Sequence, residues 1–281
     1  MEKSEQIKRA QALRALHRPP PILLLPNAWD LISARIFADA GYPAIATTSG
    51  GVAWALGYAD GEKTPWAEVV DATARIAAAV SVPVTADIEA GYGKAPEEVA
   101  RHVVEIAQAG AAGVNLEDGA GGGLRNVEDA AARIAAARRA VSDAGLDIVI
   151  NARTDVYLHG SGDAAAKHDE AVKRGQAYLA AGADCIYVFA LTDLATITAI
   201  TRALAAPVNI MGRAGTPPLA ALEDAGVARV SIATGATLVA ASLLQQLAKD
   251  LRAKGDFGML EHRMTRAEAQ QLFAQRKGWR S

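Results

Sequence analysis

Short runs rich in valine, isoleucine and leucine recur along the chain, and alanine-rich stretches separate them. Eight such runs occur, at residues 22–27, 44–50, 82–91, 113–118, 147–155, 185–191, 207–212 and 229–234. In the stretches between them, such as 132–141, the apolar residues recur with the spacing of a helix. The pattern therefore predicts eight strands that alternate with helices.

Glycines mark the ends of several predicted helices, just before the next strand begins. They are Gly41, Gly110, Gly145, Gly182 and Gly226. Strands that alternate with helices imply parallel pairing with right-handed crossovers. The length of 281 residues is close to the ~250 typical of a (β/α)8 barrel, which is the predicted fold, with a doubly wound open sheet as the alternative. No linker divides the sequence, so residues 1–281 are predicted to form a single domain.

The C-terminal segment does not fit the repeating pattern. Thr265 and Glu268 form a capping box that begins a helix, and no strand follows that helix. We therefore expect residues 265–281 to form an extra helix that protrudes and packs either on its own barrel or on a neighbouring subunit.

Composition narrows the classes of partner. The chain is 51% apolar and 21% charged, with a formal net charge of −2 and no cluster of lysine and arginine, which argues against nucleic acid and anionic membrane as partners. The one cysteine, Cys185, excludes an intrachain disulfide and fits a reducing compartment. The charged N-terminus lacks the apolar segment of a secretory signal, and no apolar run approaches the ~20 residues that span a bilayer. A cytoplasmic protein is expected.

Polar side chains gather at the carboxyl ends of the predicted strands. They are Asp87 and Glu89 in the third run, Asn115 and Glu117 in the fourth, Asn151, Arg153 and Asp155 in the fifth, and Asn209 in the seventh. Residues two apart in a strand share a face, and the active sites of such barrels lie at the carboxyl ends of the strands. A single residue of this kind is as readily a rim group or a buried hydrogen-bonding partner. Three neighbouring strands with the same pattern favour a functional site.

The carboxylates of Asp87, Glu89 and Glu117 are expected to crowd into a partly enclosed barrel mouth. Without compensation at least one of them would take up a proton, whereas a hard divalent cation such as Mg2+ relieves the repulsion. The sequence has no HxxH, HExxH or cysteine pair, so a zinc site is not expected. No lysine ends a strand, which argues against a Schiff-base aldolase.

Two further elements of the mouth have the chemistry to hold an anion. Ser49 and the amides of Gly50 and Gly51 follow the second run and can bind a carboxylate or a phosphate, although most such stretches are simply turns. Arg153 offers the planar fork that suits a carboxylate, and its alternative role is an inward ion pair with one of the strand-end glutamates.

The histidines contribute little to this picture. His159 lies beyond the fifth run and is the one placed to reach the mouth. The other four lie on predicted helices or near the chain ends and are expected to be solvated: His17, His102, His168 and His262.

Taken together, the motifs resemble the isocitrate lyase/phosphoenolpyruvate mutase superfamily over most of the chain. The similar segments are LPNAWDLISARIFADAGYPAIATTSGG (25–51), ADG (59–61), TADIEAGYG (85–93), GVNLED (113–118), NARTD (151–155), HDEAVKRGQAYLAAGAD (168–184) and VNIMGRAGTPPLAALEDAGVARVS (208–231). The resemblance implies a (β/α)8 barrel whose last helix swaps onto a partner, usually in a tetramer of paired dimers.

The resemblance also implies roles for the mouth residues. Mg2+, or Mn2+ in its place, would bind to Asp87. Three further acids, Asp60, Glu89 and Glu117, would reach the ion mostly through water. The carboxylate of a 2-oxo acid would be held by Ser49, Gly50 and Gly51, in a pocket lined by Trp29 and Arg153. We expect Asn209 to contact the substrate as well, and Arg153 and Glu117 to take part in catalysis.

The segment after the fourth run departs from the superfamily pattern. Lyases of the superfamily carry K-[KR]-C-G-H there, on a long mobile loop whose cysteine is the catalytic acid/base, and the phosphonate mutases carry K-T-N-S. Residues 119–125 read GAGGGLR, without cysteine, histidine or lysine, and Asn126 is placed to cap the next helix. We expect a short, pliable turn rather than a catalytic lid. A phosphate cradle is the weaker alternative, because the lysine and hydroxyl of GxxxxGK[ST] are missing. Cys185 cannot take over, because it begins the sixth run at the opposite end of the barrel.

Members of the superfamily break or move C–C or C–P bonds beside a pyruvate-like or glyoxylate-like unit, through an enolate held on the metal. Decarboxylation of an oxaloacetate-like 2-oxo acid requires little more than the metal and is the predicted reaction. Retro-aldol cleavage of the methylisocitrate or isocitrate lyase type is the alternative, but it requires a base and usually an acid, for which only Tyr92 or His159 is at hand. Phosphonopyruvate-type C–P chemistry and a non-catalytic 2-oxo-acid binder are further alternatives.

Overall fold

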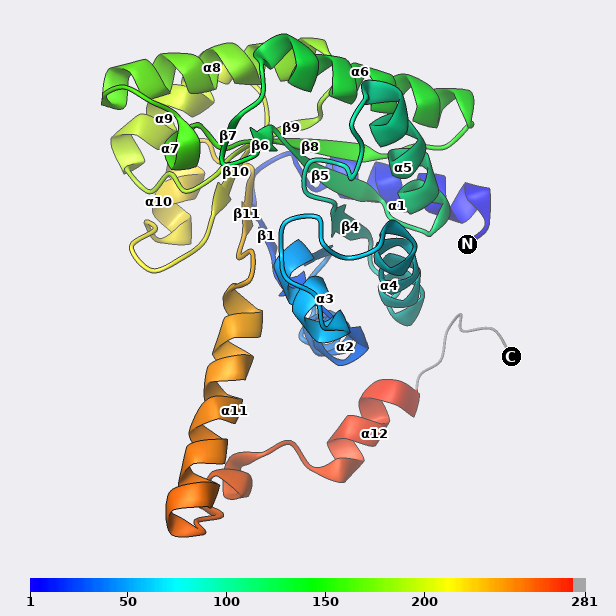
Figure 1. Cartoon of the computed structure of the whole chain (residues 1–281), viewed down its shortest axis with the longest axis vertical. Helices are drawn as coiled ribbons and strands as arrows, with labels where there is room; N and C mark the ends of the chain where they lie inside the picture. The colour runs from blue at the N-terminus through cyan, green and yellow to red at the C-terminus, as the bar shows by residue number, and fades with distance from the viewer. Residues whose placement is uncertain (275–281) are drawn as a thin grey trace.

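Strands and helices alternate along the chain as the sequence predicts (Figure 1), in the computed structural model, which describes residues 1–274. The strands of the main sheet are β1 (Leu23–Leu25), β2 (Asn27–Ala28), β3 (Ile45–Thr47), β4 (Val84–Asp87), β5 (Gly113–Glu117), β8 (Val149–Thr154), β9 (Cys185–Val188), β10 (Val208–Met211) and β11 (Arg229–Ser231). A separate small hairpin consists of β6 (Gly119–Ala120) and β7 (Gly123–Leu124). The helices are α1 (Lys3–Ala15), α2 (Leu31–Asp39), α3 (Ser49–Leu56), α4 (Trp66–Ala79), α5 (Pro96–Gln108), α6 (Val127–Asp143), α7 (Val156–His159), α8 (Ala164–Ala180), α9 (Leu194–Leu204), α10 (Leu219–Asp224), α11 (Gly235–Lys254), the 3-10 helix η1 (Gly258–His262) and α12 (Arg266–Ala274).

Pro26 divides the first predicted strand into two short strands that pair with opposite neighbours. β1 pairs with β11, and β2 pairs with β3, each in parallel register. The order of the nine strands is β1-β11-β10-β9-β8-β5-β4-β3-β2, so the two ends of the sheet are adjacent in sequence. A proline lacks the N–H that a strand interior requires, and here the break lets one segment close the ring. The (β/α)8 barrel is confirmed, and the open sheet is excluded.

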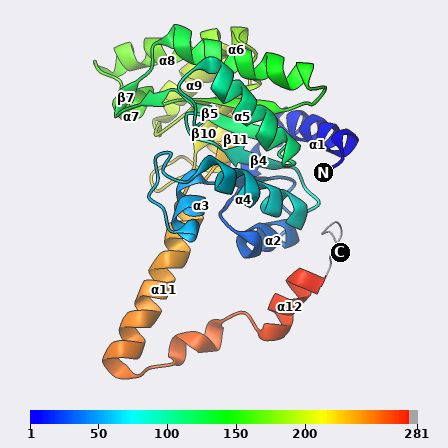
Figure 2. The same ribbon diagram turned by 45° about the vertical axis from the view of Figure 1, so that its right-hand side comes forward.

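The hydrophobic core lies mainly between the ring of strands and the helices that surround it (Figure 2). Val114, Ile150 and Ile186 on neighbouring strands are fully buried in one cluster with Val103 on α5 and Ile134 on α6. Burial of one such aliphatic side chain contributes about 1.5–3 kcal/mol. The five glycines predicted to end helices all adopt a positive φ, between 63° and 107°, a conformation that favours glycine.

Helix α1 closes the amino-terminal end of the barrel. Leu13 is fully buried in a cluster with Leu23, Ala112 and Val149, residues that lie at or just before the starts of β1, β5 and β8. A Cβ added to Gly113 would lie 2.8 Å from Cδ2 of Leu13. Helix α1 and the strands therefore approach each other too closely for a residue larger than glycine at position 113.

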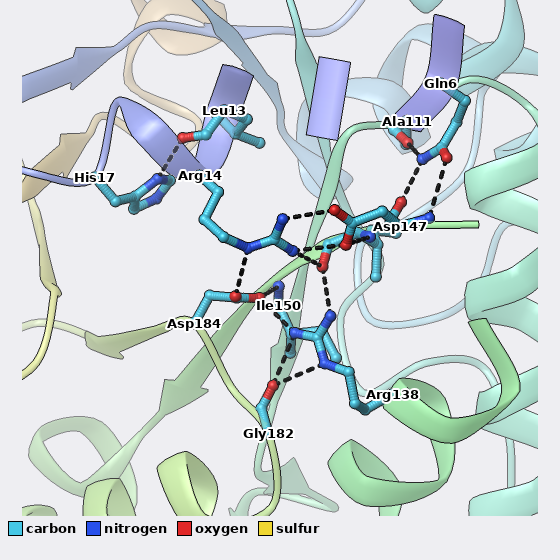
Figure 3. A network of polar contacts seen from close by, with 11 residues as sticks. Gln6, Leu13, Arg14, His17, Ala111, Arg138, Asp147, Ile150, Gly182 and Asp184 are labelled. Carbon is cyan, nitrogen blue, oxygen red and sulfur yellow. Dashed lines mark hydrogen bonds and ion pairs between the residues drawn. The ribbon is translucent and has the colours of Figure 1, made fainter. Parts of the chain in front are cut away.

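A polar network fastens the same helix to the loops below the strands (Figure 3). Arg14 donates to both carboxylate oxygens of Asp147, at 2.6 and 2.7 Å, and to Asp184 at 2.9 Å. Arg138 also binds Asp184 and donates to the carbonyl of Gly182. Burial opposes the ionised form of Asp147, but the bonds from Arg14 outweigh it and hold the pKa of that carboxyl below its usual range. These ion pairs thus stabilise the amino-terminal end of the barrel, opposite the mouth.

His17 corrects one expectation, because it is buried rather than solvated. Its side chain is only 3% exposed, and its Nδ1 lies 2.8 Å from the carbonyl oxygen of Leu13 (Figure 3). Burial, with the positive charge of Arg229, lowers the pKa of His17 to about 4. The sequence around His17 does not predict its burial, because the burial arises where the chain turns under the barrel after α1.

The C-terminal part leaves the barrel earlier than the sequence suggests. Helix α11 projects from the mouth side of the ring (Figure 1), and its Val239, Leu243 and Leu244 are between 57% and 66% exposed. The chain then returns, and α12 packs against α2, where Arg35 donates to the carbonyl of Leu272 at 2.7 Å. The capping box of Thr265 and Glu268 is present. The protruding part thus begins at 235 rather than 265, while helix exchange stays a prediction and residues 275–281 lie outside the described part.

Within residues 1–274, every helix is too short or too polar to cross a membrane.

We expect Arg14→Ala to lower the free energy of unfolding by about 2 kcal/mol, because it removes charge-assisted hydrogen bonds from a partly buried network. Urea unfolding at pH 7 measures the change. The control is Arg75→Ala, which removes an ion pair whose two side chains are each 58% exposed and should change stability by less than about 0.5 kcal/mol. The pKa of Asp147 lies below 3.8 in the folded chain, so this contribution is complete at neutral pH and fades as the pH falls below that value. Equal effects of both substitutions would contradict the role of the network.

We expect the full chain to be an oligomer that α11 and the residues after it hold together, because the exposed leucines of α11 need a covering surface. Leu243→Glu combined with Leu244→Glu should give a smaller or less soluble species, and so should deletion of residues 265–281. Light scattering measures the molar mass. The matched control is Gln245→Glu with Gln246→Glu, which adds the same charge at exposed polar positions of the same helix. An unchanged molar mass in both the leucine variant and the deletion would count against the interface.

A candidate active site at the mouth of the barrel

The carboxyl ends of the strands open into a polar cavity of about 370 Å3. Five of the predicted site residues line it: Ser49, Asp60, Glu89, Glu117 and Arg153. Parallel strands in a closed ring all end at the same rim, so side chains from loops far apart in sequence meet there. Asp155 and His159 line it as well. The other predicted residues lie behind or below this lining.

Glu117 and Arg153 stand opposite each other in the pairing of β5 with β8. Arg153 Nη1 lies 2.8 Å from Glu117 Oε2, and the rest of the fork binds Asp155, with Nε–Oδ1 and Nη2–Oδ2 distances of 2.6 and 3.0 Å. The guanidinium also lies 3.6 Å from the centre of the Phe189 ring. Burial raises the pKa of Glu117 to about 8, although the charge of Arg153 opposes the rise. The inward ion pair considered from the sequence is present, and its use for a substrate carboxylate stays a prediction.

Glu89 lies two residues beyond the end of β4 and is held by a loop from the previous unit. Its carboxylate accepts the peptide N–H of Glu62, at 2.9 and 3.0 Å, and the hydroxyl of Tyr92 at 3.0 Å. The N–H of Tyr92 donates in turn to Glu62 Oε1 at 2.6 Å. Burial raises the pKa of Glu89 to about 7, against the lowering effect of the bond from Glu62.

The contacts among Glu62, Glu89 and Tyr92 form a small latch between two loops. All three residues have positive φ, at 57° for Glu62, 52° for Glu89 and 55° for Tyr92. Such conformations are strained in residues other than glycine and persist only where surrounding contacts hold them. The latch ties the loop that carries Asp60 to the loop after β4. Sequence reasoning missed Glu62, because nothing in its local pattern signals a contact with a residue 27 positions away.

Asp87 ends β4 and binds the start of α3. Its Oδ2 accepts from the N–H of Ser49 at 3.1 Å and from its hydroxyl at 2.9 Å. The N–H of Asp87 donates to the hydroxyl of Thr47 at 2.9 Å. Asp60 lies beside the same start of α3, because a Cβ added to Gly50 would lie 3.0 Å from Asp60 Oδ2. Burial, together with the charge of Asp87, raises the pKa of Asp60.

Ser49, Gly50 and Gly51 form the first turn of α3 rather than a simple turn after a strand. The first amides of a helix have no acceptor within the helix and suit an anion, and Thr48 makes no side-chain cap. A Cβ added to Gly51 would lie only 2.6 Å from Thr237 Oγ1 and 2.8 Å from Cβ of Trp29. Tight packing therefore requires glycine at 51, and Trp29 lies against it.

The asparagines predicted at the strand ends lie below the cavity, inside the barrel. Asn151 donates to Asn115 at 2.8 Å, and Arg229, which is fully buried, donates to the same oxygen at 3.2 Å. Asn209 is also fully buried and donates to Ser231 at 3.2 Å. These amides are the buried hydrogen-bonding partners that the sequence left open as an alternative. Contact of Asn209 with a substrate stays a prediction.

The glycine-rich segment after β5 is a tight hairpin at the edge of the cavity. β6 pairs with β7 in antiparallel register, and Gly121 and Gly122 at its tip have φ values of 56° and 82°. The N–H of Arg125 donates to the carbonyl of Asp118 at 2.8 Å, which closes its base, and the side chain of Asn126 caps α6. The short turn and the cap predicted from the sequence are both confirmed.

Asp118 faces away from the cavity, although it follows Glu117 directly. It is 1% exposed, and its carboxylate accepts from the N–H of Asp155, from Arg174 and from the hydroxyl of Tyr178. Because Asp155 holds the fork of Arg153, Asp118 positions the ion pair indirectly. Neighbouring residues in a strand point to opposite faces, which separates the roles of these two acids.

The remaining side chains of interest occupy the positions expected for them. His159 lines the cavity, in agreement with its position after β8. Cys185 begins β9 and is fully buried. Burial raises the pKa of its thiol to about 12, so it is a protonated wall residue far from thiolate chemistry.

The donor set of the mouth fits a hydrated divalent cation. Among residues 1–274 no three side chains of histidine, cysteine, aspartate and glutamate converge closely enough to enclose a metal ion directly. Mg2+ does not require such a cage, since it commonly takes one or two carboxylates and keeps several waters. Burial, with the charges of neighbouring acids, raises the pKa of Glu89 and Glu117, and a bound cation would favour their ionised forms. Asp87, Asp60, Glu89 and Glu117 are the residues that would hold it.

Comparison with known proteins points to one enzyme family. The family profile described as phosphoenolpyruvate phosphomutase matches residues 13–252. The 2-methylisocitrate lyase of Escherichia coli K12 is 34% identical over 71% of this chain and 69% of its own length. Oxaloacetate decarboxylase 2 of Pseudomonas fluorescens Pf0-1 is 33% identical over 73% of this chain and 70% of its own. A crystal structure of a putative phosphonomutase from Burkholderia cenocepacia J2315 is 44% identical, with a TM-score of 0.83, and covers 87% of this chain and 99% of that one.

These matches extend over most of the chain and include the strands and loops that form the mouth. The chain therefore belongs to the phosphoenolpyruvate phosphomutase family, within the isocitrate lyase/phosphoenolpyruvate mutase superfamily.

Proposed function

We propose that this protein is a divalent-metal-dependent carbon–carbon lyase that decarboxylates an oxaloacetate-like 2-oxo diacid. The observation that carries the proposal is the hairpin at 119–124. It places only glycine, alanine and leucine beside the acidic cavity, where the lyases that the chain resembles are expected to carry a cysteine. The site therefore suits a reaction that requires few general acids or bases from the protein.

The residues of the mouth divide the work of binding. Ser49 and the free amides of α3 would receive the carboxylate next to the 2-oxo group, because helix amides suit anions. Arg153 would supply positive charge at the opposite wall, with its fork oriented by Asp155 at 2.6 and 3.0 Å. The latch between Glu62 and Glu89 would hold Asp60 and Glu89 at the rim. A divalent cation, when bound, supplies a Lewis acid that stabilises the negative charge developing on the 2-oxo oxygen.

Decarboxylation fits this set better than the other reactions of the superfamily. When CO2 leaves a 2-oxo diacid, the bond electrons pass to the adjacent carbonyl as an enolate, which water can protonate. A retro-aldol cleavage instead needs a base for the hydroxyl of the substrate and an acid for the carbanion. The hydroxyl of Tyr92 is committed to Glu89, so it is not free for either role.

Retro-aldol cleavage is the second candidate, and one observation favours it. His159 lines the cavity, and an imidazole is the side chain that most often acts as a general base. The similarity to 2-methylisocitrate lyase points in the same direction. The similarity to a putative phosphonomutase keeps C–P chemistry as a further candidate, although no lysine among residues 1–274 lines the cavity. A non-catalytic 2-oxo-acid binder would show binding without turnover.

We expect Asp87→Asn to weaken Mg2+ binding at least about tenfold, because it removes the charge of the carboxylate proposed to touch the ion. Titration calorimetry with Mg2+ alone measures the affinity, and turnover should fall with it. The control is Asp71→Asn, which changes an exposed aspartate paired only with Arg75 on the outer surface of α4. Unchanged Mg2+ affinity in the Asp87 variant would refute this metal assignment.

We expect the wild-type chain to consume oxaloacetate faster than 2-methylisocitrate or isocitrate at equal concentration with Mg2+ present. The rate on oxaloacetate must be corrected for its spontaneous metal-catalysed decay. Cys185→Ser should keep turnover within a few-fold, since the thiol is fully buried in the wall, while it loses roughly 1–3 kcal/mol of stability through the buried hydroxyl. Faster cleavage of either hydroxy acid, lost on Cys185→Ser, would overturn both the decarboxylase proposal and the interpretation of the hairpin.

A further inference from the structure

The cavity contains more acids than bases, and one of its two arginines is already neutralised. The basic side chains in its lining are Arg125, Arg153 and His159. Arg153 binds Glu117 and, through two bonds, Asp155. Three of the five N–H groups of its guanidinium are thus bound to carboxylates of the chain, which balance its charge. A dicarboxylate bound by one end at the metal and α3 therefore needs another cation for its other end.

Arg125 is held at the edge of the cavity by its main chain. Its N–H donates to the carbonyl of Asp118 at 2.8 Å, and its own carbonyl accepts from Arg174 Nη1 at 2.9 Å. Both partners are anchored, because Arg174 also donates to the carboxylate of Asp118 at 3.1 Å, inside the barrel wall. The main chain of Arg125 is therefore fixed between the hairpin and α6, and the residue lines the cavity.

The side chain of Arg125 has hydrogen-bonding capacity that the described residues do not use. Its Nη1 lies 3.4 Å from Asp129 Oδ2, near the upper limit for a hydrogen bond. Asp129 has a shorter contact with Arg133 Nε, at 3.2 Å, so it keeps a cationic partner if Arg125 turns away. The Nε of Arg125 is buried and has no hydrogen-bond partner among residues 1–274. A buried N–H without an acceptor is costly and calls for a ligand or a water.

We propose that Arg125 is a specificity-determining residue that binds the distal carboxylate of the substrate, the one farther from the 2-oxo or 2-hydroxy acid unit. The inference rests on the proposed function for the orientation of the substrate, but not on which bond is cleaved. A cavity of about 370 Å3 is at the small end of the usual range for ligand sites, which suits a short diacid. The site then distinguishes dianions from monoanions of the same length by one charge-assisted contact.

The matched probes are malate and 2-hydroxybutyrate, which have the same four-carbon chain and differ in the distal group, a carboxylate in one and a methyl in the other. Calorimetry with Mg2+ present measures both affinities, and neither compound can be decarboxylated as a 2-oxo acid. We expect the wild-type chain to bind malate at least about tenfold more tightly, the scale of one charge-assisted hydrogen bond. Arg125→Gln should bring malate down to the level of 2-hydroxybutyrate and leave 2-hydroxybutyrate unchanged.

Two further variants separate this contact from general charge and from folding. Arg139→Gln makes the same change of charge at an exposed position on α6 and should leave both affinities unchanged. Arg125→Lys keeps the charge without the fork and should restore part of the malate affinity. Retained binding of 2-hydroxybutyrate shows that the variants are folded around an intact metal end.

A kinetic readout distinguishes this contact from a merely structural role of Arg125. In decarboxylation the distal carboxylate loses its charge as CO2, so the contact stabilises bound substrate more than the transition state. Arg125→Gln should therefore raise the KM for oxaloacetate at least about tenfold without lowering kcat, which should stay level or rise. Malate binding that is equal in wild type and Arg125→Gln, or no preference for malate in the wild type, would overturn the proposal. A chain that prefers malate through Arg125 but does not decarboxylate oxaloacetate would refute the proposed function and leave this inference standing.

Discussion

The parallel pairing of the strands in a closed ring is the constraint on which the site depends. Every strand of the ring ends at the same rim, so each strand-end charge faces the charges of its neighbours. The register places Glu117 opposite Arg153 on β5 and β8, and the ion pair between them follows directly. Burial in the mouth raises the pKa of Glu89 and Glu117 to about 7 and 8, and the charges of neighbouring acids add to the rise. The geometry of the ring thus gathers acids at the mouth whose charged forms burial disfavours.

The two ends of the barrel use charge in opposite ways. At the amino-terminal end, Arg14 and Arg138 neutralise Asp147 and Asp184 within one network (Figure 3), which fastens α1 across the ring. At the mouth, acids are left in excess. This division is typical of the fold, in which the closed end provides stability and the open end provides chemistry. At the mouth, hydrogen bonds among three residues with positive φ hold their strained conformations.

The hairpin after β5 determines which side chains border the cavity on this side. Its base is rigid, because Asp118 and Arg125 are joined by a main-chain hydrogen bond, and its tip consists of glycines. Residues 119–124 carry no acid or base to the cavity, whereas Arg125, directly after the hairpin, lines it.

The sequence by itself determined the fold and most of the cavity lining, because both follow from short-range patterns. Alternating apolar runs and helical spacing predict the barrel, and strand parity places Glu117 and Arg153 on the inner face. The alternation of side chains along a strand does not show how far below the mouth an inward side chain lies. Asn115, Asn151 and Asn209 were therefore expected in the mouth, although they lie fully or nearly buried beneath it.

Only the tertiary structure decided the contacts that join distant segments. The bond from Glu62 to Glu89, the burial of His17 under the barrel and the departure of α11 from the ring all depend on how loops meet in space. A residue's neighbours in sequence do not encode such meetings, because they arise from closure of the ring, which brings together residues up to about two hundred positions apart, as with Asn27 and Ile232. The sequence therefore specifies which groups the mouth contains, and the closed barrel decides which of them touch.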